Sequence, residues 1–151
     1  MGRATASIKV KGRAAEAEAL WYDPYRWPSW VDGFGHVIRL EGDWPDVGSR
    51  LVWASPPGGR GMVQERVVAY ESRTGQTLEV EDETMTGRQI VSFTPGLEET
   101  EVTLTLEYTL KGRNLLTPIV DLLFIRRTMS DALSRTLRRF ANERAAEIQF
   151  G

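Results

Sequence analysis

The segment EVTLTLEYTLKG, residues 101–112, alternates between apolar and polar side chains. A period of two predicts a β-strand that packs one face on a core and turns the other to water. Five segments between Gly33 and Pro95 have the same character and are separated by turn-forming residues: FGHVIRLEG, SRLVWASPP, GMVQERVVAYE, QTLEVEDETM and RQIVSFTP. TASIKVKG, near the N-terminus, predicts one more strand. The chain is therefore expected to form an antiparallel sheet of about seven strands with one face covered.

The cover for this sheet is predicted from the C-terminal segment, which has no glycine between Leu115 and Gln149 and only Pro118 near its start. At about 100° per residue, an apolar stripe runs along one side of a helix built from this segment. The stripe contains Leu122, Met129, Leu133 and Phe140, with Ile119 and Leu137 near its edge. We therefore expect a long amphipathic α-helix laid across the sheet.

Two short helices are expected between the first strand and the second. RAAEAEALWY is rich in alanine, glutamate and leucine, which favour a helix. In DPYRWPSW, residues 23–30, Asp23 and Pro24 suit the start of another helix, which Pro28 limits to about one turn. The aromatic side chains of this segment must be buried somewhere. Trp27 and Trp30 are expected to close one end of the core, with an edge of Trp30 facing a ligand.

Composition narrows the classes of function. The 151 residues carry a formal net charge of −2, which argues against a nucleic-acid partner. The chain has no cysteine and a single histidine, so neither a metal site nor a cofactor is expected. It shows neither a signal peptide nor an apolar run long enough to span a membrane. We expect one cytoplasmic domain over residues 1–151, without integral membrane association.

Two glycine-rich stretches look like nucleotide-binding loops but do not match them. GFGHVI lacks the third glycine of the dinucleotide fingerprint and precedes a strand. PPGGRG, residues 56–61, is not followed by the Lys-Ser/Thr pair of a phosphate-binding loop. Both are predicted to be turns, the second as a flexible hairpin.

The order of elements resembles the START-like or Bet-v-type (SRPBCC) superfamily, particularly its bacterial polyketide cyclase/dehydrase-like branch. DPYRWPSW, GDWPDVGSRLVW and TPIVDLLFIRRTMSDALSRTLRRF carry the resemblance. It implies an α+β helix-grip fold, in which a curved antiparallel sheet wraps around a long C-terminal α-helix and two short helices follow the first strand. It also implies a cavity between sheet and helix. Members include lipid carriers, plant hormone binders, aromatase/cyclases and coenzyme Q-binding proteins, so the fold alone does not define the activity.

Residues on the inner faces of the strands and the long helix are the candidates for lining this cavity. An apolar cleft with a few convergent polar groups is the usual form of a small-molecule site. The alternation of the strands and the helical stripe, together with Trp30 of the end wall, give nine candidates: Trp30, His36, Trp53, Glu65, Asp82, Gln89, Tyr108, Arg126 and Met129. Two alternatives stay open. A shift of one residue in register would turn Glu65 or Asp82 to solvent, and a buried arginine–carboxylate pair could belong to the core alone.

The leading hypothesis is a binding module that holds a hydrophobic or amphipathic small molecule of lipid, polyketide or aromatic type. The alternative is a cofactor-independent cyclase or dehydrase that uses acid–base residues in the same cavity. His36, Glu65 or Asp82 would then be the base, with Arg126 or Tyr108 as the donor to a developing enolate. A third hypothesis is a structural or chaperone-like partner for a lipid or quinone.

The start of the long helix, LLTPIVDLLFI, is apolar on nearly all sides. Leu116, Val120, Leu123 and Phe124 lie outside the stripe that faces the core. A helix that is apolar all round is usually buried or part of an interface. A homodimer contact and a segment that gates the cavity are both open hypotheses for this stretch.

Overall fold

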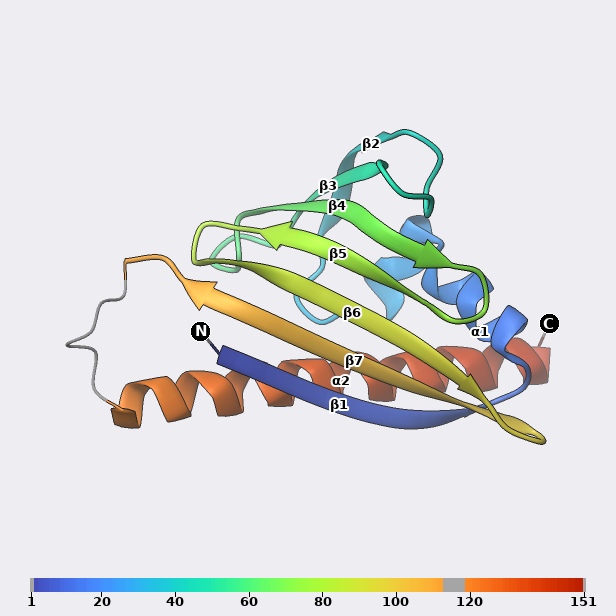
Figure 1. Cartoon of the computed structure of the whole chain (residues 1–151). Helices are drawn as coiled ribbons and strands as arrows, with labels where there is room; N and C mark the ends of the chain where they lie inside the picture. Colours follow the sequence, from blue (N-terminus) through green and yellow to red (C-terminus); the bar gives the residue numbers. More distant parts are fainter. Residues whose placement is uncertain (1, 113–118, 151) are drawn as a thin grey trace.

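The computed structural model describes residues 2–112 and 119–150. The elements follow the order expected from the sequence (Figure 1). They are β1 (Gly2–Lys11), α1 (Ala14–Trp21), the 3₁₀ helix η1 (Pro24–Ser29), β2 (His36–Glu41), β3 (Arg50–Ala54), β4 (Met62–Glu71), β5 (Gly75–Glu81), β6 (Met85–Pro95), β7 (Glu99–Leu110) and α2 (Ile119–Phe150).

The seven strands form one antiparallel sheet in the order β1-β7-β6-β5-β4-β3-β2. Strands β2 to β6 are each paired with the next strand in the chain, and β1 pairs with β7 along its whole length. The sheet curves over α2, which runs alongside β1 and β7 (Figure 1). The predicted α+β helix-grip arrangement is therefore confirmed.

The core lies between the inner face of the sheet and α2. On β7 the side chains of Val102, Leu104, Leu106 and Tyr108 are buried, as the alternation predicted. On α2 the buried apolar residues are Leu133, Leu137 and Phe140. The helix and the sheet therefore meet along the predicted stripe in the second half of α2.

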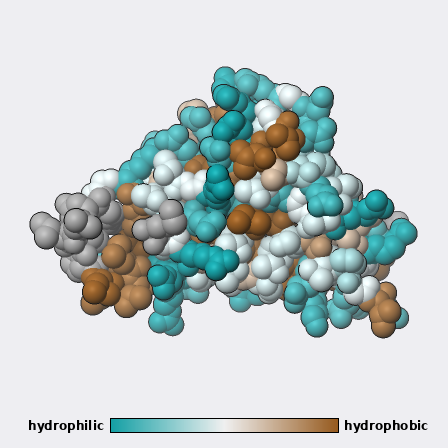
Figure 2. All heavy atoms as spheres, in the orientation of Figure 1, coloured by the Kyte–Doolittle hydropathy of each residue, from teal (hydrophilic) through white to brown (hydrophobic). Residues whose placement is uncertain are grey.

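The predicted stripe is wrong for the first turns of α2, where Leu122 is 42% exposed and Ile119 is 73% exposed. The reason is length, because these turns project past the end of β1, where the sheet no longer covers the helix (Figure 1). Apolar surface is visible over this end of the molecule, at the lower left (Figure 2).

The predicted inward orientation of His36 on β2 is also wrong, because its side chain is exposed. A β-bulge interrupts the pairing of β2 with β3 between Val37 and Arg39. The buried Trp53 of β3 lies opposite Val37 and not opposite His36. Since directly opposed residues share a face of the sheet, Val37 packs on the core and His36 points away from it.

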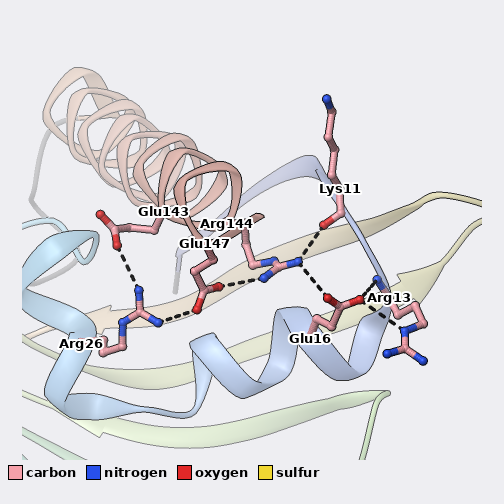
Figure 3. Close-up of polar contacts among 7 residues, drawn as sticks. All are labelled: Lys11, Arg13, Glu16, Arg26, Glu143, Arg144 and Glu147. Atoms are coloured by element: carbon pink, nitrogen blue, oxygen red, sulfur yellow. Dashed lines mark hydrogen bonds and ion pairs between the residues drawn. The ribbon is translucent and has the colours of Figure 1, made fainter. Parts of the chain in front are cut away.

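A group of ion pairs ties the end of α2 to the N-terminal elements (Figure 3). Arg144 is buried, with 4% of its surface exposed. Its Nη1 donates to Glu147 over 2.8 Å, and its Nη2 donates to the backbone oxygen of Lys11 over 3.2 Å and lies 3.6 Å from Glu16. Glu147 also accepts a hydrogen bond from Arg26, the basic residue of η1. β1, α1 and η1 are thus all joined to the second half of the long helix.

Across residues 2–112 and 119–150, none of the helices has the length and apolar character required to cross a membrane.

Candidate functional site

A cavity of about 530 Å³ lies between the inner face of the sheet and α2. Its apolar lining comes from α1, from η1 and the residues after it, from the sheet and from α2: Trp21, Trp27, Trp30, Val31, Leu78, Leu104, Leu106, Met129 and Leu133. Four consecutive exposed residues of the lining, 56–59, belong to the β3–β4 loop. This loop therefore borders the open side of the cavity.

Three tryptophans form the end wall of the cavity. The ring centroids of Trp21 and Trp30 are 4.7 Å apart, and Trp30 packs edge-on against Phe140 of α2 at 4.9 Å. The indole N–H of Trp27 donates to the backbone oxygen of Trp21 over 2.8 Å. The predicted burial of Trp27 and Trp30 at the end of the core is confirmed. Within the described residues the indole N–H of Trp30 has no acceptor, although it is buried.

Asp82 is the most completely buried acid in this region, with a side chain that is 0% exposed. Its Oδ2 accepts a 2.7 Å hydrogen bond from Nε of Arg60, which lines the cavity. Its Oδ1 accepts from the backbone and hydroxyl of Thr84 and from the backbone of Met85. Burial alone would raise the pKa of Asp82, but the hydrogen bonds from Arg60 and Thr84 outweigh it and hold the pKa below its usual range. Asp82 is therefore an ionised anchor for Arg60.

Glu65 lies on the inner face of β4, where its Oε1 accepts a 3.0 Å hydrogen bond from the indole N–H of Trp53. Burial raises the pKa of Glu65 to about 7, against the weaker opposing effects of Trp53 and of the charge on Arg60. The guanidinium carbon of Arg60 lies 5.3 Å from the centroid of the Trp53 ring. Glu65, Trp53, Arg60 and Asp82 are thus one connected polar group beside the cavity.

The sequence-predicted site residues fall into three sets. Trp30, Gln89 and Met129 line the cavity. Trp53, Glu65 and Asp82 are buried in the polar group that includes Arg60, so both acids are turned away from solvent, but none of these three residues lines the cavity itself. The third set belongs neither to the cavity lining nor to this polar group: Tyr108, His36 and Arg126.

The residues of the third set are absent from the cavity for different reasons. Tyr108 is buried, but its ring packs against Gly2, its partner in β1. His36 is exposed because of the bulge in β2. Arg126 is exposed because it belongs to the part of α2 that the sheet covers poorly, so its predicted position facing the cavity is wrong.

Sequence reasoning missed two arginines of the lining. Arg60 belongs to PPGGRG, which was expected to be only a flexible hairpin, and nothing in that motif indicates a buried acid as its partner. Arg135 on α2 binds Asp32 through two hydrogen bonds of 3.2 Å each. The backbone N–H of Asp32 in turn donates to the hydroxyl of Thr136. The segment after η1 is therefore fastened to α2 at the open side of the cavity.

Residues 1–144 match the family model described as polyketide cyclase / dehydrase and lipid transport. The chain belongs to this family. The resemblance to the START-like (SRPBCC) superfamily and its polyketide cyclase branch is therefore confirmed. A comparison with curated proteins finds no significant match.

Solved structures share the fold of this family member at low sequence identity. A protein from Thermus thermophilus is 16% identical, with a TM-score of 0.72, over 97% of this chain and 99% of that one. The di-domain ARO/CYC StfQ from the steffimycin biosynthetic pathway is 18% identical, with a TM-score of 0.74, over 95% of this chain and 51% of StfQ. A norcoclaurine synthase mutant from Thalictrum flavum is 14% identical, with a TM-score of 0.68, over 97% of this chain and 95% of that one.

Proposed function

We propose that this protein binds a hydrophobic or amphipathic small molecule in the cavity between the sheet and α2. The observation that carries the proposal is a cavity of about 530 Å³ walled by three tryptophans and by aliphatic residues of the sheet and the helix. Small-molecule sites usually have volumes of about 300–1,000 Å³ and an apolar lining with a few polar groups. Here Arg60, Gln89 and the Asp32–Arg135 pair supply those polar groups.

The family description, which includes lipid transport, supports this proposal. Two of the similar structures are an ARO/CYC protein of the steffimycin biosynthetic pathway and a norcoclaurine synthase. Lipid, polyketide or aromatic molecules are accordingly the ligands to test first.

Native mass spectrometry of gently purified protein tests for a co-purified ligand, and a panel of fluorescent lipids and polyaromatic compounds tests binding directly. Ala132→Phe places a larger side chain in the cavity lining. We expect this variant to weaken binding at least about tenfold, because the added ring occupies the ligand's volume. Arg126→Ala is the matched control, since Arg126 is exposed on the same helix and lies outside the lining.

Arg126→Ala should bind like the unmodified protein. If nothing co-purifies and no compound of the panel binds, the proposed function is wrong. Equal affinity of both variants for a bound compound would place that compound outside the cavity.

A cyclase or dehydrase activity is a second candidate, and one observation favours it. Glu65 has a pKa of about 7 in a buried position, so it can both accept and release a proton near neutral pH. Arg60 replaces Arg126 as the donor that could stabilise an enolate, since Arg60 lines the cavity. Asp82 is a poor base, because four hydrogen bonds already satisfy its carboxylate.

The two functions separate in the variant Glu65→Gln. If the protein is an enzyme, turnover of a poly-β-ketone analogue should be lost with its binding largely kept. If the protein is only a binder, no turnover is found in either form. The single domain over residues 1–151 and the cytoplasmic location stay predictions.

A further inference from the structure

Arg60 is the one charged residue of the β3–β4 loop, SPPGGRG, and it reaches the cavity lining from the open side. The loop is closed by two hydrogen bonds between Ser55 and Gly61, each of 2.9 Å. Gly58 and Gly61 have φ angles of +84° and +75°, which favour glycine and let the chain turn tightly here. The loop therefore has a defined path that carries Arg60 toward the sheet.

Asp82 binds the guanidinium of Arg60 through a single nitrogen. The ion pair uses Nε of Arg60, at 2.7 Å from Oδ2 of Asp82. The central carbon of the guanidinium lies over Trp53, at 5.3 Å from the ring centroid. These two contacts hold the side chain in place before any ligand arrives, which lowers the entropic cost of binding.

The other two nitrogens of Arg60, Nη1 and Nη2, make no hydrogen bond with any residue in 2–112 or 119–150. The other arginine of the lining, Arg135, is differently engaged, because it binds Asp32 through two of its nitrogens. Arg60 is therefore the cation of the lining with both terminal nitrogens available to a ligand. Such a pair of parallel N–H donors matches the two oxygens of a carboxylate, whereas a phosphate dianion usually recruits further cations.

We propose that the ligand is an amphipathic carboxylate: its two oxygens accept hydrogen bonds from Nη1 and Nη2 of Arg60, and its apolar body lies against the tryptophan end wall. This inference rests on the proposed function, since it requires a small molecule in the cavity. Asp82 is then a positioning residue, because it acts through Arg60 and its own carboxylate is already saturated.

The test compares anthracene-2-carboxylate with its neutral isostere anthracene-2-carboxamide, by isothermal titration calorimetry at pH 6. At this pH the ligand is ionised, while Glu65, whose pKa burial raises to about 7, is mostly neutral and does not repel it. We expect the unmodified protein to prefer the carboxylate by at least about tenfold, the effect of a charge-assisted hydrogen-bonded pair. Arg60→Gln should remove this preference and leave the affinity for the carboxamide within about twofold.

Three further variants keep the test decisive. The double variant Arg60→Gln/Asp82→Asn removes both charges together, so no unpaired buried acid is left if the single variant fails to fold. It should also bind the two probes equally. Arg60→Lys keeps the charge but loses the two parallel donors, and should show a reduced preference. Arg126→Gln, an exposed arginine outside the lining, should keep the full preference.

Equal binding of both probes to the unmodified protein overturns the inference, as does a preference that survives in Arg60→Gln or in the double variant Arg60→Gln/Asp82→Asn. In that case loss of binding in Ala132→Phe would still support the proposed function. If neither probe binds and the wider ligand panel also fails, the inference and the proposed function are both wrong.

Discussion

Glu65 is a buried acid whose protonation depends on folding. Its pKa is raised to about 7 from 4.5, so the folded protein keeps a proton that the unfolded chain has released. Stability therefore falls between about pH 4.5 and pH 7, where the unfolded state binds fewer protons than the folded state. Below about pH 4.5 the Glu65 carboxyl does not change the free energy of unfolding, and above about pH 7 its destabilising effect is complete.

Glu65→Gln should remove this pH dependence, because glutamine stays neutral and can still accept the hydrogen bond from Trp53. Urea denaturation should show little change at pH 4 and a gain of up to about 3 kcal/mol at pH 8. Glu83→Gln is the control, since Glu83 is exposed. Equal stability of the Glu65→Gln variant and the unmodified protein at pH 8 would contradict the raised pKa.

Residue orientation was predictable wherever a strand alternates without interruption. Buried and exposed residues alternate on β4 around Glu65, and the alternation of β5 continues to Asp82, the residue after its end. Both acidic side chains are buried as expected. On β2 the bulge offsets the alternation, so His36 is exposed. A bulge depends on the pairing of two strands, which one strand's own sequence does not reveal.

At the scale of elements, the two ends of α2 have different surroundings. From Leu133 onward the helix packs on the core through Leu133, Leu137 and Phe140, whereas its first turns expose apolar side chains. The buried Arg144 holds the packed half, because it binds Glu147 and the backbone of Lys11. The N-terminal elements and the end of α2 are therefore expected to unfold together.

Arg144→Ala should destabilise the protein by about 2–3 kcal/mol, because it removes these hydrogen bonds and the packing of a buried side chain. The midpoint of urea denaturation measures this loss. Arg138→Ala, at an exposed position of the same helix, should change stability by less than about 0.5 kcal/mol. Equal effects of the two variants would argue against a structural role for Arg144.

At the scale of the whole molecule, the apolar first turns of α2 form an exposed patch of five residues: Ile119, Val120, Leu122, Leu123 and Phe124. A homodimer through this patch stays a prediction. Size-exclusion chromatography with light scattering should give a dimer that Phe124→Asp converts to a monomer, since a charge in an apolar interface is costly. Arg127→Ala, an exposed neighbour on α2, should leave the dimer intact. A clean monomer of the unmodified protein at high concentration would contradict the dimer.

The sequence alone determined the number and type of elements, because periods of two and 3.6 and the turn-forming residues are local properties of the chain. It also indicated the helix-grip family, whose motifs lie within single segments. The tertiary structure decided which polar side chains meet. Arg60 and Asp82 are 22 residues apart and pair only because the β3–β4 loop turns back to the sheet. Arg126 carries the helical phase of the stripe but is exposed, because the extent of the sheet determines where α2 is covered.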